Sequence, residues 1–188
     1  MVSLEEAYSY VKSQLKDGRY IHTLGVISVA KKLAELNDYS VEKAEIAALC
    51  HDIAKNIPKD EMLMLFEKYN IVLTQEEKST KSLWHSILAP HIAREKLDID
   101  DEEILSAIRW HTTGKSDMSL LDKIIYIADM IEPSRDFDGV KEIRKITLKN
   151  LDKGVLAGIN HTIKYLLEDD KLLDINTIEA RNYLLLNK

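Results

Sequence analysis

The sequence contains one cysteine among its 188 residues. A single cysteine excludes an internal disulfide and any metal site that needs several thiolate ligands. Because Cys50 lies in the apolar stretch IAALC, we expect its thiol to be buried and to pack as a small apolar group. A metal site in this chain would therefore use imidazole nitrogens and carboxylate oxygens.

Long apolar runs are also missing, and those present are only a few residues long. A helix that spans a bilayer needs roughly 18 to 20 consecutive apolar residues. The acidic start MVSLEE lacks the basic segment with which a signal peptide begins. Both absences predict a cytoplasmic protein without a membrane partner.

The chain has no excess of positive charge, since 26 Lys and Arg stand against 32 Asp and Glu and give a formal net charge of -6. Proteins that grip nucleic acid polymers do so through many neutralising Lys and Arg side chains. The charge therefore predicts no nucleic acid polymer as a partner. A small anionic ligand held by a local group of cations is compatible with it.

Glycine and proline are scarce, with six and three residues, and no linker or repeat divides the chain. The length suits one domain, and apolar residues recur with helical spacing along most of it. Only NIVLT at 70–74 resembles a strand, and Pro90 predicts a helix that begins late or kinks. The sequence therefore predicts an all-α single domain. Helices are expected near residues 3–16, 20–36, 40–54, 58–69, 83–97, 101–113, 119–132, 139–151, 153–168 and 175–186.

Four polar residues stand where a soluble helix would not need them for packing. They are His22, the adjacent pair His51 and Asp52 at the end of a small-residue helix, and Asp129 inside the apolar stretch IIYIADMIEP. An unpaired buried carboxylate is costly, so Asp129 predicts a cation or a metal beside it. Taken alone, Asp52 could cap the next segment, and Asp129 could pair with Lys123 or Arg135. Together, two imidazoles and two carboxylates suit Fe, Mn or Zn.

The order His, His-Asp, Asp resembles the HD-domain superfamily of metal-dependent phosphohydrolases. More narrowly, the chain resembles the YqeK family, the bacterial symmetrical bis(5'-nucleosyl)-tetraphosphatases. The resemblance implies one HD-type helical bundle over 1–188, with a metal-site core at about 19–140 and C-terminal helices at about 141–188. The matching segments are RYIHTLGVISVAKKLA (19–34), AALCHDIAK (47–55), LWHS (83–86), AIRWHTTG (107–114) and MSLLDKIIYIADMIEPSRDFDGV (118–140).

The resemblance also implies roles for individual residues. The metal ligands would be His22, His51, Asp52 and Asp129, holding iron, with manganese or zinc as alternatives. A second ion, held with His85 and His111, is also compatible with it. The residues expected to bind substrate are Arg19, His22, Lys55, His85, His111, Arg135 and Arg181, and those expected to act in catalysis are Asp52, His111, His85 and Lys55.

The implied reaction is attack of a metal-bound hydroxide on a central phosphorus of diadenosine tetraphosphate, which gives two ADP. Asp52 would be a metal ligand, a general base or both, and a homodimer is compatible with the chain. We also expect Asp122, two helical turns before Asp129, to orient a His or a Lys of the site. Two alternatives are a 5'-nucleotidase on the same scaffold and a nucleotide-binding regulatory module without turnover.

Overall fold

The protein, described here as a computed structural model over residues 2–187, consists of helices and the turns that join them. In chain order the elements are α1 (Leu4–Gln14), α2 (Asp17–Leu36), α3 (Val41–Cys50), α4 (Lys59–Lys68), α5 (Gln75–Ser79), the short 3-10 helix η1 (Lys81–Leu83), α6 (Trp84–Leu97), α7 (Glu102–Trp110), α8 (Leu120–Ile131), α9 (Val140–Thr147), α10 (Leu151–Glu168) and α11 (Ile175–Leu186). This architecture confirms the all-α prediction. None of these helices is both long and apolar enough to cross a bilayer.

Side chains at the helix starts explain several of the boundaries. Ser3 and Glu6 form a capping box at α1, and Thr74 and Glu77 form another at α5, as their spacing predicts. The side chain of Ser40 accepts a hydrogen bond from a backbone N–H in the first turn of α3. Each cap satisfies backbone groups that a helix leaves unpaired at its start.

Three local details differ from what the sequence pattern indicates. Residues 70–74 form no strand; Asn70 has a left-handed backbone with φ of 54°, and Val72 is 90% exposed. The helix that contains Pro90 does not begin late, because it starts at Trp84, and packing of buried side chains on both sides of the proline holds it. Helix α2 begins at Asp17 rather than near residue 20, and Gly18 lies in its first turn.

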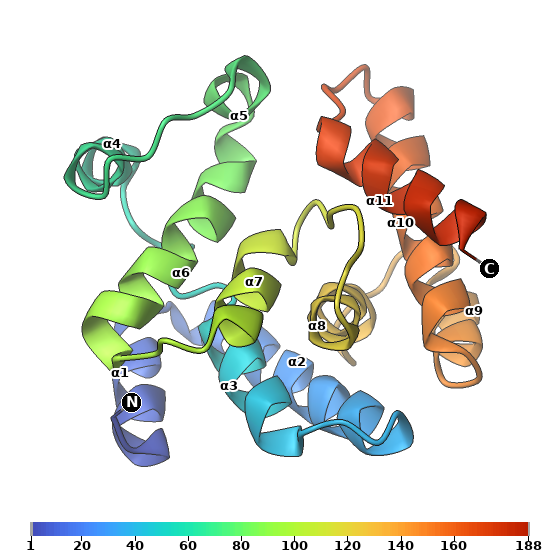
Figure 1. The fold of residues 1–188 in the computed structure, drawn as a ribbon, viewed down its shortest axis with the longest axis horizontal. Coiled ribbons are helices and arrows are strands. Elements are labelled where there is room, and N and C mark those ends of the chain that lie inside the picture. Colours follow the sequence, from blue (N-terminus) through green and yellow to red (C-terminus); the bar gives the residue numbers. More distant parts are fainter. Residues whose placement is uncertain (1, 188) are drawn as a thin grey trace.

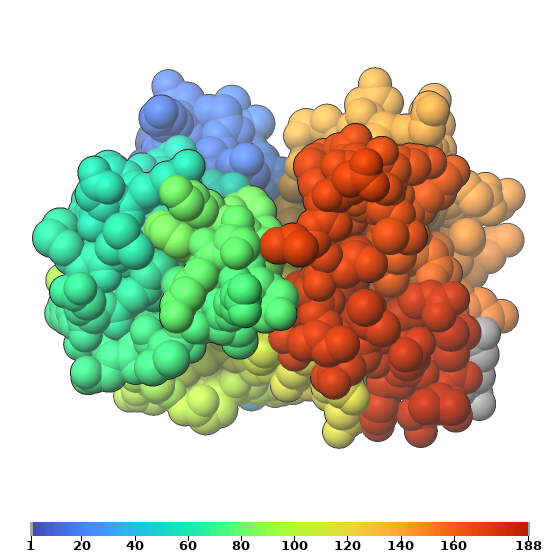
Figure 2. All heavy atoms as spheres, turned by 90° about the horizontal axis from the view of Figure 1, so that it is seen from above, coloured from blue at the N-terminus to red at the C-terminus, as the bar shows by residue number. Residues whose placement is uncertain are grey.

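Helix α8 lies in the middle of the molecule, between α7 and the C-terminal helices α9, α10 and α11 (Figure 1). It also packs against α2 and α3, which pack closely on each other. Seen from above, α4 to α6 and the C-terminal α10 and α11 lie side by side across the surface (Figure 2). Helices α2, α3 and α8 therefore meet near the middle of the molecule.

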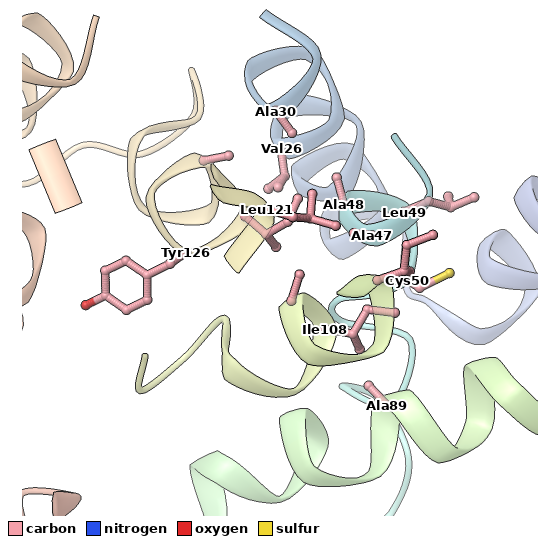
Figure 3. Packing of buried hydrophobic residues seen from close by; sticks show 14 of the residues in the cluster. Val26, Ala30, Ala47, Ala48, Leu49, Cys50, Ala89, Ile108, Leu121 and Tyr126 are labelled. Atoms are coloured by element: carbon pink, nitrogen blue, oxygen red, sulfur yellow. The ribbon is translucent and has the colours of Figure 1, made fainter. Parts of the chain in front are cut away.

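Small side chains make the close packing around α3 possible. Ala47 and Ala48 are fully buried and lie near Val26 and Ala30 of α2 and near Leu121 of α8 (Figure 3). Short side chains let helix axes approach, which is what the alanine-rich stretch before His51 predicts. Polar side chains at the ends of these three helices can therefore meet.

Candidate metal centre

The site begins where α3 ends. His51 follows the last residue of α3, and residues 51–56 continue as turns, so His51 and Asp52 project inward from a buried turn. They are 0% and 2% exposed, respectively. His22 reaches the same point from the first half of α2, and Asp129 reaches it from the last turn of α8.

The four predicted ligands converge. His22 Nε2 lies 3.0 Å from Asp129 Oδ1 and 4.0 Å from Asp52 Oδ2, while His51 Nε2 lies 3.5 Å from Asp52 Oδ2. Two sets of donor atoms each fall within 4.8 Å of one another, and they share His51. One set is His22, His51 and Asp129; the other is His51, Asp52 and His111.

The orientation of the imidazoles fits a cation at the centre. His51 donates Nδ1–H to the carbonyl of Ala48 over 2.7 Å, and the Nδ1 of His22 lies 3.0 Å from Oε1 of Glu132. Both rings therefore direct an Nε2 lone pair inward. These two Nε2 atoms and Oδ1 of Asp52 are buried and have no hydrogen-bond partner within the described residues. Because buried polar atoms are normally paired, this donor set fits a divalent metal.

Two further histidines extend the cluster. His85 Nε2 lies 3.1 Å from His111 Nε2 and 3.1 Å from Asp52 Oδ1. His111 donates Nδ1–H to the carbonyl of Ile108 over 2.8 Å. Lys55 Nζ lies 3.1 Å from His85 Nε2 and 3.7 Å from Asp52 Oδ1. His85, His111 and Lys55 thus stand together on one side of Asp52.

Burial sets the charge state of the cluster. It lowers the pKa of His51 and that of His85 to about 4, so both imidazoles are neutral at pH 7. Burial also lowers the pKa of Lys55, although Asp52 opposes that shift.

The carboxyl groups stay ionised for the opposite reason. Burial raises the pKa of Asp52, but His51, His111 and His85 outweigh it and hold the pKa well below its usual value. Burial likewise raises the pKa of Asp129, and contacts with His22, His51 and Arg135 outweigh it. Neutral imidazoles and ionised carboxylates are the protonation states that a metal site needs.

Guanidinium groups flank the two carboxylates. Arg19 Nη1 donates to Asp52 Oδ2 over 2.9 Å. Arg135 Nη2 donates to Asp129 Oδ1 over 2.6 Å, and its Nε donates to the carbonyl of Asp129 over 2.9 Å. The remaining guanidinium N–H groups can bind an anion, so the cluster carries local positive charge in an acidic protein.

The sequence profile of the HD domain matches residues 19–134, which contain all four predicted ligands. The chain belongs to the HD-domain family. Among proteins similar to it is one from Bacillus subtilis named symmetrical bis(5'-nucleosyl)-tetraphosphatase, with 39% identity over 96% of each chain. A protein of the same name from Halalkalibacterium halodurans is 38% identical over 97% of each chain.

A solved structure from Clostridium acetobutylicum, described as a predicted HD superfamily hydrolase involved in NAD metabolism, has the same fold as this HD domain. The two share 41% identity with a TM-score of 0.96, and the match covers 100% of both chains. The single-domain HD helical bundle is therefore confirmed.

Two cavities open beside the cluster of this HD domain and share Arg135 and Phe137 in their walls. One, of about 390 Å³, is polar and contains Arg19, His22 and Ser134 in its lining. The other, of about 360 Å³, reaches from the cluster toward α10 and is lined by His111, Thr112, Tyr126, Asp129, Met130, Arg135, Phe137, His161, Thr162 and Tyr165.

The second cavity has aromatic walls. The ring centroids of Phe137 and His161 are 4.4 Å apart. The hydroxyls of Thr112 and Tyr126 are buried without a hydrogen-bond partner within the described residues, and Tyr126 points away from the core residues around Ala47 (Figure 3). His161 therefore lines this cavity beside the cluster.

Two predicted residues lie elsewhere. Arg181 donates to Asn160 over 2.6 Å and lines a separate groove between α10 and α11, so the structure does not bring it to the cluster. Asp122 accepts from Ser106 over 2.8 Å and lies 3.3 Å from Nζ of Lys115, with no hydrogen bond to the cluster.

Glu132 is not among the site residues that the sequence predicts. This carboxylate is 1% exposed and contacts His22, although it stands in the turn sequence EPS. Burial raises its pKa, but hydrogen bonds from Ser134 and the contact with His22 outweigh this effect and lower it. Gly25, three residues after His22, was a signal in the sequence. Glycine disfavours a helix interior, so its presence there indicates that another part of the chain approaches closely.

Proposed function

We propose that this HD domain hydrolyses diadenosine tetraphosphate symmetrically to two ADP. One observation carries the proposal: the buried cluster with its three unpartnered donor atoms is flanked by the cations Arg19, Lys55 and Arg135. Relatives named as symmetrical tetraphosphatases support it, since their similarity extends over nearly the whole chain.

The divalent metal would be held by His22, His51, Asp52 and Asp129, with iron as the proposed ion and manganese or zinc as alternatives. When bound, such an ion lowers the pKa of a coordinated water and polarises a phosphoryl oxygen. Its affinity is expected to depend on all four side chains, because His22, His51 and Asp129 form one convergent donor set and Asp52 lies 3.5 Å from Nε2 of His51.

The cations would bind the four-phosphate bridge. Arg19 pairs with Asp52, and Arg135 pairs with Asp129. The guanidinium N–H groups that do not contact these carboxylates can bind phosphate oxygens on either side of the central anhydride. Lys55 stands beside His85 and can neutralise the leaving diphosphate. Placing the cleaved bond between these cations accounts for two equal products.

Asp52 and the two further histidines would act at the reacting phosphorus. The carboxylate oxygen of Asp52 that does not bind the metal would accept a hydrogen bond from the attacking water and direct the lone pair of that water at phosphorus. The Nε2 atoms of His85 and His111 lie 3.1 Å apart. The Nε2–H of neutral His85, or that of His111 in its imidazolium form, would donate to a phosphoryl oxygen.

The aromatic cavity would hold one nucleoside. The Phe137 and His161 rings offer apolar faces for a base, and the unpartnered hydroxyls of Thr112 and Tyr126 can bind its polar edge or the ribose. The polar cavity on the other side of Arg135 would take the second half of the substrate.

A cytoplasmic location and a homodimer are further predictions from the sequence.

Product analysis tests this function. Metal-loaded protein is incubated with diadenosine tetraphosphate, and the nucleotides are separated by ion-exchange chromatography. ADP as the sole product supports the proposal, whereas ATP plus AMP contradicts it. Release of phosphate from nucleoside monophosphates without cleavage of the dinucleotide would identify the 5'-nucleotidase. Tight nucleotide binding without any product would identify the regulatory module.

A further inference from the structure

Glu132 contacts a predicted metal ligand from the side that faces away from the cluster. Its Oε1 lies 3.0 Å from Nδ1 of His22, and its side chain is 2% exposed. An ionised carboxylate only accepts hydrogen bonds, so His22 must donate from Nδ1. The lone pair on Nε2 then faces Asp129 and the centre of the cluster.

The turn that carries Glu132 is itself fixed. The backbone N–H of Ser134 donates to Oε2 of Glu132 over 2.7 Å, and the hydroxyl of Ser134 donates to Oε1. Arg144 from α9 donates to the carbonyls of Ile131, Glu132 and Arg135 over 2.8, 2.7 and 2.8 Å. The carboxylate is therefore held in place independently of His22.

Gly25 makes room for this contact. A Cβ atom built on Gly25 would lie 2.6 Å from Oε2 of Glu132, closer than nonbonded atoms can approach. Glycine inside a helix costs roughly 1 kcal/mol relative to alanine. Helix α2 thus lacks a side chain at a position where Glu132 approaches its backbone, three residues from His22.

We propose that Glu132 is a positioning residue that fixes the tautomer and ring orientation of His22 for metal binding, and that Gly25 exists to admit it. The inference rests on the proposed function only in that His22 holds a metal. Carboxylates that accept from a ligating histidine typically contribute 10- to 100-fold to metal affinity.

The test measures Mn²⁺ affinity by competition with a chromophoric chelator. Glu132→Ala is expected to bind Mn²⁺ about 10- to 100-fold more weakly than the unsubstituted protein. Glu132→Gln keeps an acceptor for Nδ1–H and is expected to recover part of that loss. Asp122→Asn is the matched control, because Asp122 is a buried carboxylate on α8 without a hydrogen bond to His22.

A double substitution separates positioning from general stability. Gly25→Ala alone is expected to weaken Mn²⁺ binding as Glu132→Ala does, because the new methyl group displaces the carboxylate. In a Glu132→Ala background the same Gly25→Ala change is expected to have no further effect on Mn²⁺ affinity. The d–d absorption of Co²⁺-loaded protein provides a second readout, since it reports ligand geometry and is expected to change only in the position 25 and 132 variants.

Unchanged Mn²⁺ affinity in both Glu132→Ala and Gly25→Ala would overturn the inference and leave the proposed function standing. Equal losses in Asp122→Asn, or additive losses in the double variant, would also overturn it, because both point to general destabilisation. Failure of the unsubstituted protein to bind any divalent ion would instead refute the proposed function.

Discussion

Two carboxylates on the same helix, the buried Asp122 and the half-buried Asp129, have opposite surroundings. Asp122 in the first turn of α8 accepts hydrogen bonds from the backbone of Ser119 and the hydroxyl of Ser106, and Lys115 lies 3.3 Å away. Asp129, seven residues later, faces donor atoms of His22 and His51 that have no hydrogen-bond partner within the described residues.

The difference separates a carboxylate whose hydrogen bonds are complete within the fold from one that we propose holds a metal. Asp122 caps α8 through a reciprocal box with Ser119, so its hydrogen bonds are complete within the fold. The cluster around Asp129 is incomplete without a cation, because buried polar atoms without partners are costly. Substitutions in the cluster around Asp129 are therefore expected to affect metal binding, and substitution of Asp122 is expected to affect stability.

The largest effect is expected for Asp129→Ala. Removing this carboxylate deletes one donor of the metal set and leaves Arg135 without its partner. Bound metal and hydrolysis of diadenosine tetraphosphate are both expected to fall to background in assays of metal content and ADP release. His51→Ala is expected to behave alike. Activity in a variant shown to be metal-free would contradict the mechanism.

A smaller loss is expected for Arg135→Ala. Charge-assisted hydrogen bonds contribute roughly 1.5 to 3 kcal/mol, so kcat/KM should fall about 10- to 100-fold if Arg135 binds the phosphates. Arg94→Ala is a control, since Arg94 forms ion pairs with Asp100 and Glu102 far from the cluster. Equal kinetics in both variants, at equal metal content, would exclude Arg135 from substrate binding.

Acid is expected to destabilise the metal-free protein through the cluster. His51 and His85 have a pKa of about 4 in the folded state, against roughly 6.5 when unfolded. The unfolded chain then binds more protons between these values, so stability is complete above pH 6.5 and falls as the pH drops toward 4. Each histidine contributes up to roughly 3 kcal/mol to this loss.

Urea unfolding of metal-free protein at pH 7, 6 and 5 measures this effect. His85→Gln removes one of the two groups and should make the pH dependence shallower without changing its direction. A free energy of unfolding that stays constant from pH 7 to 5 would show that the two imidazoles are not buried in neutral form.

The smallest effect on function is expected for Asp122→Ala. The variant loses a helix cap and a buried hydrogen bond, so its free energy of unfolding should fall by about 2 kcal/mol. Metal content and ADP release below the unfolding temperature should remain normal. If circular dichroism shows that the Asp122→Ala variant is fully folded and the variant nevertheless lacks metal, Asp122 belongs to the site.

Helix positions and the convergence of His22, His51, Asp52 and Asp129 could be predicted from the sequence, because both follow from local signals. Capping residues such as Ser3 mark helix starts, and an aspartate such as Asp129 within an apolar stripe marks a buried polar site. The start of the helix through Pro90 was harder to predict than its presence, since tertiary packing outweighs the local penalty of proline and α6 begins at Trp84.

The contact of Glu132 with His22 could not be predicted either. These residues are 110 positions apart, and their contact depends on how α2 crosses the end of α8. The aromatic cavity is equally nonlocal, because Phe137 and His161 come from a turn and from α10. Only Gly25, a glycine inside a helix, hinted that another element approaches there.

The central claim is that the cluster around Asp129 is a metal centre and that the polar network of Asp122 is not. Its most direct test is the metal content of the unsubstituted protein, Asp129→Ala and Asp122→Ala, each purified without chelator and measured by inductively coupled plasma mass spectrometry. The account predicts bound divalent metal in the unsubstituted protein and in Asp122→Ala, and none in Asp129→Ala. Equal metal content in Asp129→Ala and the unsubstituted protein would contradict it.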